Sequence, residues 1–202
     1  MGERVARLDR VDDSRGHRRN LPSTRLRGPL RAGPDRVLAV QVEVRLARAG
    51  DAEATMAIYN AEVTGSTVTF DLVPRSLEEQ RSWLAGHAGA HPAIVAVVDG
   101  EVVGFGSLSP YRSRPAYSTS VEDSVYVRAD RRGLGCGRVL LEELVALATA
   151  HGFHTVIARI VGGHEASIAM HRACDFNLVG VEREIGRKLG RWLDVVVMQR
   201  ML

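Results

Sequence analysis

A glycine-rich turn between an apolar strand and an amphipathic helix constrains this chain more than any other feature of its sequence. The turn reads Arg132-Gly133-Leu134-Gly135-Cys136-Gly137, follows a strand that ends at Val127, and leads into a predicted helix over 137–150. Glycines have no Cβ, so backbone N–H groups can converge at the start of a helix and bind an anion such as a pyrophosphate. The turn therefore predicts a pyrophosphate-binding site within an α/β domain.

Two common phosphate-binding motifs do not fit this turn. A P-loop requires Gly-Lys-Ser/Thr, which the chain does not contain. The dinucleotide-binding motif requires a third glycine where Arg138 or Leu140 stands. On the local pattern alone, a glycine-rich turn that binds no ligand stays open as an alternative.

The periodicity of apolar residues predicts the elements around the turn. A strand ends at 124–127, and further strands are expected over 42–47, 93–98, 102–111, 154–160, 176–184 and 192–201. Helices are expected from 50–51 onwards and over 76–87, 137–150 and 165–174. Strands interspersed with helices in this way predict one α/β domain.

The positive charge of the chain is concentrated at its beginning. The formal net charge is +3, yet residues 1–40 hold ten arginines against five acidic residues, and residues 41–202 hold a small excess of acidic residues. The first forty residues show neither strand nor helix periodicity. We therefore expect a disordered basic tail over 1–41 and a folded domain over 42–202 that has no nucleic-acid partner.

Composition argues against several other classes of protein. Cys136 and Cys174 are the only cysteines and lie far apart, so neither a disulfide framework nor a zinc site is expected. His151 and His154 lack further ligands at metal-binding spacing, and we expect no metal. Apolar runs such as 195–198 are too short to span a membrane, and no secretory signal is evident, so we expect a cytoplasmic protein without a membrane partner.

Beyond the turn, the sequence resembles one enzyme family over most of its length. Arg132-x-x-Gly135-x-Gly137 resembles the Arg/Gln-x-x-Gly-x-Gly/Ala signature of the GNAT N-acetyltransferases. Residues 42–200 resemble the phosphinothricin and methionine sulfoximine acetyltransferase branch of that superfamily, and the blocks that carry this likeness are 65–70, 110–117, 122–127, 167–171 and 190–195. The resemblance implies a GNAT fold: a mixed, mostly antiparallel central sheet flanked by helices, with a splayed strand pair that binds acetyl-CoA. It also implies a homodimer.

The resemblance places the acetyl-CoA site on one strand, the turn and the following helices. The turn amides would hold the pyrophosphate, and the strand edge would bind the pantetheine amides by strand augmentation. The residues expected to bind the cofactor are Val125, Tyr126, Val127, Arg132, Gly133, Leu134, Gly135, Cys136, Gly137, Arg138, His164 and Ser167.

Two residues are expected to carry the chemistry. An amine substrate arrives protonated, so a base must remove a proton before the nitrogen attacks the thioester. Glu122, just upstream of the cofactor strand, is the candidate base, with Asp123 as its alternative. His171 stands where many family members carry a tyrosine that assists the departing thiolate. On the predicted helix, Ser167 and His171 are four residues apart and share one face.

A second group of residues is expected to bind the substrate. Arg112 and Arg114 could hold the carboxylate and second acidic group of an amino-acid-like molecule through charge-assisted hydrogen bonds. Phe70, Tyr117 and Trp192 could form aromatic walls around it.

Three departures from the family pattern affect the predicted helix over 165–174. His164 replaces the usual asparagine, which weakens an expected contact to the pantetheine arm. Asp175 replaces the usual glycine, and aspartate adopts the left-handed conformation of a helix C-terminus less readily. The segment Gly162-Gly163 is an addition before the helix.

The expected function is transfer of the acetyl group of acetyl-CoA to the amino group of a small amino-acid-like molecule, such as phosphinothricin or methionine sulfoximine. Three alternatives stay open: acetylation of a protein N-terminus or lysine, a non-catalytic coenzyme A sensor, and a nucleic-acid-associated protein directed by its basic tail. Arg112 and Arg114 favour the small molecule because they suit a free carboxylate, and Glu122 with His171 favours an enzyme over a sensor.

Overall fold

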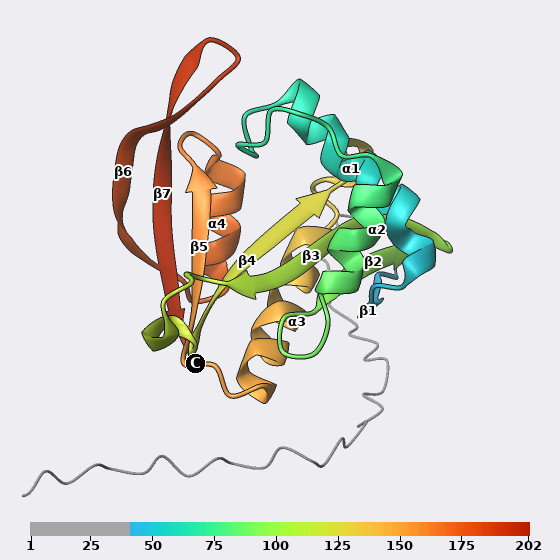
Figure 1. The fold of residues 1–202 in the computed structure, drawn as a ribbon, viewed down its shortest axis with the longest axis horizontal. Helices are drawn as coiled ribbons and strands as arrows, with labels where there is room; N and C mark the ends of the chain where they lie inside the picture. Colours follow the sequence, from blue (N-terminus) through green and yellow to red (C-terminus); the bar gives the residue numbers. More distant parts are fainter. Residues whose placement is uncertain (1–40) are drawn as a thin grey trace, which may run out of the picture.

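The structure, a computed structural model, describes residues 41–202. Within them, seven strands form one sheet in the order β1-β2-β3-β4-β5-β7-β6 (Figure 1). Only the β4–β5 pair is parallel. The strands are β1 Glu43–Leu46, β2 Ala93–Val98, β3 Glu101–Pro110, β4 Ser120–Val127, β5 Thr155–Val161, β6 Asn177–Lys188 and β7 Arg191–Met201. The predicted mixed, mostly antiparallel sheet is confirmed; the predicted tail, except for residue 41, lies outside the described residues.

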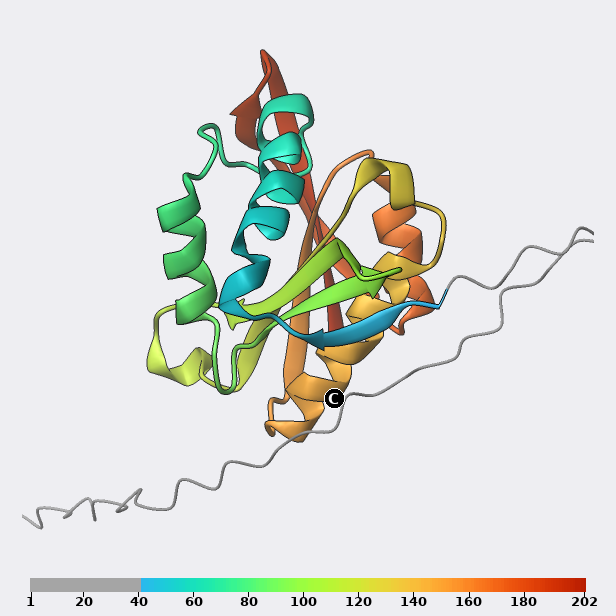
Figure 2. The same ribbon diagram turned by 90° about the vertical axis from the view of Figure 1, so that its right-hand side faces the viewer.

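In the described part of the chain, four helices flank the sheet, two on each face. In Figure 2, α1 and α2 lie on one side of the central strands, and α3 and α4 lie on the other. The helices are α1 Ala52–Gly65, α2 Leu77–Gly86, α3 Cys136–Ala150 and α4 Glu165–Ala173, with short 3-10 turns η1 Ala49–Asp51, η2 Pro115–Tyr117 and η3 Ala129–Arg131. All helices therefore occur where the periodicity predicts them, with small differences at their ends.

Alternating side chains of the central strands build two hydrophobic clusters. Ile94 of β2 packs into the cluster that includes Leu140 and Leu144 of α3. Val95, the next residue, points to the opposite face and packs into the cluster with Ile58 of α1. Successive side chains of a strand point to opposite faces, so a fully apolar strand such as β2 can support helices on both sides.

Local sequence signals explain where several elements begin and end. Ser76 caps α2, because its Oγ accepts from the Glu79 N–H at 3.2 Å while the Glu79 carboxylate accepts from the Ser76 N–H at 2.7 Å. The β2–β3 hairpin turns at Asp99 and Gly100, which both have positive φ angles, of 51° and 82°.

The C-terminus of α4 shows how the chain accommodates Asp175 in place of the usual glycine. Asp175 adopts a left-handed conformation with a φ of 63°, and the Phe176 N–H donates to the His171 carbonyl at 3.0 Å. This bond across five residues is that of a Schellman motif. The Arg200 guanidinium donates to the Cys174 carbonyl at 2.6 Å beside it. The helix thus ends in the usual way although aspartate occupies the glycine position.

The parallel pair β4 and β5 separates soon after it begins. Cα pairing is limited to Ser120 with Thr155, Val121 with Val156 and Glu122 with Ile157. Beyond Glu122, β4 remains paired with β3 on its other side. Figure 1 shows the two strands diverging from this point. The expected splayed strand pair is therefore present, and it leaves one edge of β4 free of a strand partner.

Candidate active site

A cavity of about 550 Å³ opens where β4 and β5 diverge. Its walls come from both strands, the glycine-rich turn, α4 and the loop after α1. Most residues expected from the sequence to bind acetyl-CoA or to act in catalysis line it: Glu122, Val125, Tyr126, Val127, Arg132, Gly133, Gly135, Cys136, Gly137, Arg138, His164, Ser167 and His171. Leu134 does not line the cavity; it packs against the hydrophobic core instead.

The glycine-rich turn delivers the N-terminus of α3 to this cavity. Gly135 is the N-cap residue and has a φ of 84°, a left-handed conformation that favours glycine. Because glycine has no side chain to cap the first turn, the amides of that turn are left for a ligand. A Cβ on Gly137 would lie 3.0 Å from Met170 Sδ, so glycine also allows α3 to approach α4 closely. This arrangement suits a pyrophosphate.

Arg132 ties the turn to two other elements. Its Nε donates to the Val127 carbonyl at 3.3 Å, and its Nη2 donates to the carboxylate of Glu62 on α1. Glu62 is buried and also accepts from the Ser66 hydroxyl at 2.7 Å. The signature arginine is therefore a structural link between the cofactor turn, β4 and α1.

Glu122 lies at the branch point of β4 and β5. It is half-buried, and its position in β4 places its side chain on the face opposite to that of Asp123. Burial raises the pKa of the Glu122 carboxyl above its usual range, while the positive charges of Arg159 and Arg112 act in the opposite direction. A carboxylate with a raised pKa at the end of a cavity is suited to accept a proton from an amine.

His171 points from α4 toward the other face of β4, where it meets Asp123. Its Nε2 lies 3.1 Å from Asp123 Oδ2, and its Nδ1 lies 2.8 Å from the Ser167 carbonyl oxygen. The ring also packs edge-on against Phe176. Burial disfavours the charged imidazole, but the hydrogen bond and charge of Asp123 outweigh it and raise the pKa of His171. Both His171 and Asp123 border the cavity although each is almost fully buried.

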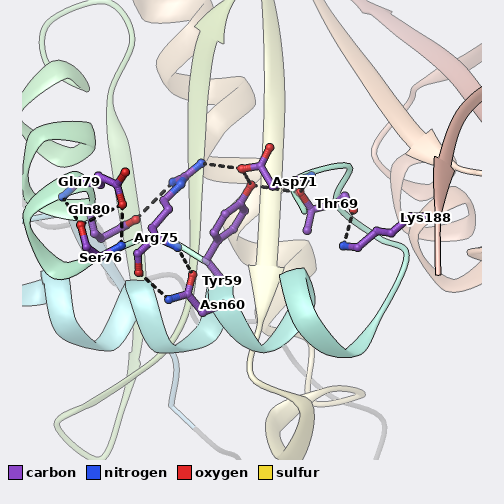
Figure 3. A network of polar contacts seen from close by, with 9 residues as sticks. All are labelled: Tyr59, Asn60, Thr69, Asp71, Arg75, Ser76, Glu79, Gln80 and Lys188. Carbon is purple, nitrogen blue, oxygen red and sulfur yellow. Dashed lines mark hydrogen bonds and ion pairs between the residues drawn. The ribbon is translucent and has the colours of Figure 1, made fainter. Parts of the chain in front are cut away.

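The loop between α1 and α2 lines part of the cavity and is held by a polar network (Figure 3). The Tyr59 hydroxyl lies 3.0 Å from Thr69 Oγ1 and donates to Asp71 Oδ2 at 2.5 Å. The Arg75 guanidinium stacks over the Tyr59 ring, 3.9 Å from its centroid. The backbone of Arg75 is fixed by both amide atoms of Asn60. These contacts fix the path of the loop on either side of Phe70.

The β6–β7 hairpin supports the same loop from the other side. Lys188 is buried, and its Nζ donates to the Thr69 carbonyl at 2.8 Å and to the Glu62 carbonyl at 3.3 Å. Burial lowers the pKa of Lys188. The Phe70 ring lies against Gly186, where a Cβ would come within 2.5 Å of it. Phe70 lines the cavity and is partly exposed; its contact with a substrate stays a prediction.

Comparisons with known proteins agree with this geometry. The acetyltransferase (GNAT) family matches residues 55–176 of the chain. The chain belongs to this family. It is 37% identical over 162 residues to the L-methionine sulfoximine/L-methionine sulfone acetyltransferase of Pseudomonas paraeruginosa, which covers 79% of this chain and 94% of that protein.

Solved structures of other GNAT proteins resemble this one closely. A phosphinothricin acetyltransferase from Sinorhizobium meliloti in complex with AcCoA has a TM-score of 0.77 and 40% identity, covering 80% of this chain and 88% of that one. Ribosomal-protein-alanine N-acetyltransferase from Brucella melitensis has a TM-score of 0.77 and 39% identity, covering 79% and 99%. The GNAT fold and the acetyl-CoA-dependent N-acetyltransferase activity expected from the sequence are confirmed.

Four of the five residues expected to bind the substrate lie outside the cavity of this GNAT domain. Arg112 and Arg114 are exposed on the loop after β3, and Tyr117 is partly exposed on the same loop. The Arg112 guanidinium lies 5.0 Å from the centroid of the Tyr111 ring. Its positive charge lowers the pKa of Glu122. Trp192 is 60% exposed on β7. Phe70 alone of the five lines the cavity.

Several residues of the site were not expected from the sequence. Arg159 lines the cavity, and its Nη2 donates to Glu182 Oε2 at 2.5 Å. Its positive charge lowers the pKa of Glu122, against the effect of burial. A signal for it exists, because it is the only charged residue in the apolar strand β5. Glu62 and Met170 also line the cavity, but no local pattern distinguishes them from ordinary helix residues.

Two further observations concern metals and membranes. Within residues 41–202, no group of three or more His, Cys, Asp or Glu side chains is placed to hold a metal ion. In the same part of the chain, no helix is long and apolar enough to cross a membrane. Cys136 and Cys174 are both buried free thiols.

Proposed function

We propose that this enzyme acetylates the α-amino group of a small amino acid of the phosphinothricin and methionine sulfoximine type. The observation that carries the proposal is the position of Glu122 at the branch of β4 and β5, with Arg112 and Arg159 close enough to affect its charge. A carboxylate faces the amine, and cationic groups nearby suit the acidic groups of an amino acid. The names of the similar proteins support the same substrate class.

Acetyl-CoA would lie along the open edge of β4. The uncapped amides at the start of α3 would bind its pyrophosphate, and the β4 backbone beyond Glu122 would bind its pantetheine amides. This path brings the acetyl thioester toward the branch point. The fit depends on Gly137, whose missing side chain keeps α3 close to α4.

In the reaction, Glu122 takes a proton from the substrate ammonium group. The freed nitrogen lone pair attacks the thioester carbonyl carbon, so that a C–N bond forms and the C–S bond breaks with its electron pair on sulfur. The nitrogen then loses its second proton to give the amide, and the thiolate takes up one proton to leave as the thiol. Burial of Glu122 helps because it raises the carboxyl pKa toward that of a useful base. The negative charge that develops on oxygen and sulfur needs positive charge or hydrogen bonds nearby.

We also propose that the protein is a homodimer in the cytoplasm. The outer strand β6 carries exposed apolar side chains, including Leu178, Val179 and Ile185, at exposed fractions of 55–61%. An edge strand with such exposed apolar residues is suited to pack against a second copy of the protein. Multi-angle light scattering on the purified protein tests this, with a dimeric mass expected and a monomeric mass contradicting it.

A thiol-release assay with acetyl-CoA tests the substrate proposal. The panel contains phosphinothricin, methionine sulfoximine and methionine sulfone, the carboxamide of each, and a peptide that begins with alanine. We expect the free acids to exceed their carboxamides in kcat/KM by about tenfold or more, since a charged hydrogen bond is worth about 1.5–3 kcal/mol.

The peptide provides the competing outcome. The structural similarity to a ribosomal-protein-alanine N-acetyltransferase makes a protein N-terminus the second candidate substrate. A preference for the alanine peptide over every free amino acid would overturn the small-molecule proposal. Equal use of acids and carboxamides would show that cationic residues do not select the substrate.

A further inference from the structure

The buried pair of His171 and Asp123 determines which protons the imidazole carries. The nearer partner of His171 Nδ1 is the carbonyl oxygen of Ser167 at 2.8 Å, which can only accept a hydrogen bond; the Ser167 hydroxyl, which can donate or accept, lies farther away at 3.4 Å. The partner of Nε2 at 3.1 Å is Asp123 Oδ2, which also accepts when the carboxyl is ionised. Only an imidazole with hydrogen on both nitrogens can donate to both partners. A neutral ring would place a lone pair against one of the two oxygens.

We propose that Asp123 is a positioning residue that holds His171 as a fixed imidazolium beside the acetyl-CoA cavity. The proposal rests on the proposed function for its kinetic consequence only; the protonation state of the ring can be measured without any turnover. It gives Asp123 a role apart from that of a base, because the side chain of Asp123 lies on the opposite face of β4 from that of Glu122.

The environment of the pair leaves few other partners for its charges. The side chains of His171 and Asp123 are 4% and 3% exposed, so water does little to solvate either group. Asp123 Oδ1 is buried and has no hydrogen-bond partner among the described residues, which leaves His171 as the cation that faces this carboxylate. Buried charges are tolerated when they are paired in this way.

Two other titratable groups lie close enough to matter. Glu122 is the next residue on β4, and the charge of Asp123 contributes to its raised pKa. His164 precedes α4, and the charge of His171 contributes to its lowered pKa. Phe176, which packs edge-on against the His171 ring, carries no charge. The dominant charged neighbour of His171 is therefore Asp123.

A fixed imidazolium has a clear use in acetyl transfer. Both ring N–H groups are already directed at Ser167 and Asp123, so neither is free to give its proton to the thiolate in this arrangement. His171 instead contributes a positive charge at the wall of the cavity, where negative charge develops as the C–S bond breaks. Loss of that charge would slow turnover more than it would weaken binding of acetyl-CoA.

Nitrogen-15 NMR of the histidine rings in the wild-type protein is the first test. At pH 7 we expect both ring nitrogens of His171 to be protonated, with titration above the ordinary pH 6.5 region. His171→Gln assigns the signal. A neutral tautomer at pH 7 would overturn the proposal, and this result needs no variant of Asp123 to fold.

Asp123→Asn is the second test. Loss of the carboxylate should move the titration of His171 to below pH 6.5. His87, which follows α2 and contacts the Trp83 carbonyl, is the internal control and should titrate as in the wild type. If His171 titrates at the same pH in wild type and Asp123→Asn, Asp123 does not control it. The variant's acetyl-CoA affinity, measured by calorimetry, should stay within about threefold of the wild-type value.

The pH dependence of kcat separates a role through His171 from a general loss of structure. In Asp123→Asn we expect kcat to fall at least about tenfold at pH 8 but less than about threefold at pH 6, where the ring can still be protonated. In a His171→Gln background, the same substitution should reduce kcat by less than about twofold further. An equal loss at both pH values, or a full loss in the His171→Gln background, would contradict the proposal.

Discussion

Replacing Lys188 by methionine should destabilise the loop between α1 and α2, which carries Phe70 at the cavity. Lys188 is the only lysine of the chain. Its buried Nζ donates to the Thr69 carbonyl (Figure 3) and also to the Glu62 carbonyl. Methionine keeps most of the side-chain volume but provides no donor. The Glu62 carbonyl retains the Ser66 N–H at 3.2 Å, so the Thr69 carbonyl is the acceptor that loses its partner.

The size of the effect follows from that single carbonyl. A buried acceptor left unpaired costs about 1–3 kcal/mol, and the ammonium no longer has to be desolvated, which offsets part of the loss. We therefore expect a loss of about 2 kcal/mol in unfolding free energy, or about 4–8 °C in Tm for a domain of this size. Because Phe70 follows Thr69, KM for the amine should rise about threefold to tenfold while KM for acetyl-CoA stays unchanged.

Thermal unfolding by circular dichroism and steady-state kinetics measure these effects. Arg191→Met is the matched control, because it removes a positive charge from the exposed end of the same hairpin. If Lys188→Met and Arg191→Met unfold at the same temperature, the buried ammonium does not anchor the loop. An equal rise in KM for the amine and for acetyl-CoA would contradict the prediction that this loop affects binding of the amine alone.

Two further predictions concern the cofactor and the carboxylate. Gly137→Val should weaken coenzyme A binding by about tenfold or more in calorimetry, because its Cβ would press on Met170 and displace the amides at the start of α3; unchanged affinity in the folded variant would leave the turn a purely structural role. Arg112→Ala should raise KM for the amino acid by about tenfold with KM for acetyl-CoA unchanged, because a charged hydrogen bond is lost; equal changes in both constants would exclude Arg112 as the carboxylate partner.

The fold could be predicted from the sequence because its signals are local. Apolar alternation identifies β2 and β3, the Asp99-Gly100 turn joins them, and the one-sided apolar pattern of α3 identifies the helix after the glycine-rich turn. The resemblance to GNAT enzymes then supplied the mixed, mostly antiparallel sheet and its splayed strand pair. Asp175 is instructive, because its effect on the helix end depended on contacts from Arg200 that are distant in sequence.

The site was most predictable where continuous segments of the chain carry its residues. Glu122 and the turn from Arg132 to Gly137 were identified because a continuous segment carries them. The pairing of Asp123 with His171 joins residues separated by 48 positions, and no local pattern reports it. Trp192 was expected at the substrate, but the β7 strand places it on the surface outside the cavity.

The role of Glu122 as the base is the central claim, and the pH dependence of Glu122→Gln tests it most directly. Burial raises the pKa of Glu122, so wild-type kcat/KM should fall as pH decreases through a value above the usual 4.5 of a glutamate. Glutamine keeps the size of the side chain but cannot accept the proton, so we expect kcat to fall by about 10²–10⁴-fold. Calorimetry should show that coenzyme A still binds with wild-type affinity.

The pH profile of Glu122→Gln tests whether Glu122 or another group is the base. We expect the acidic limb of kcat/KM to disappear in Glu122→Gln, or to move toward the pKa of the substrate amine, with partial recovery at high pH where free amine is available. Turnover of Glu122→Gln at the wild-type rate near pH 7, with the acidic limb intact, would contradict the account and assign the proton to another group.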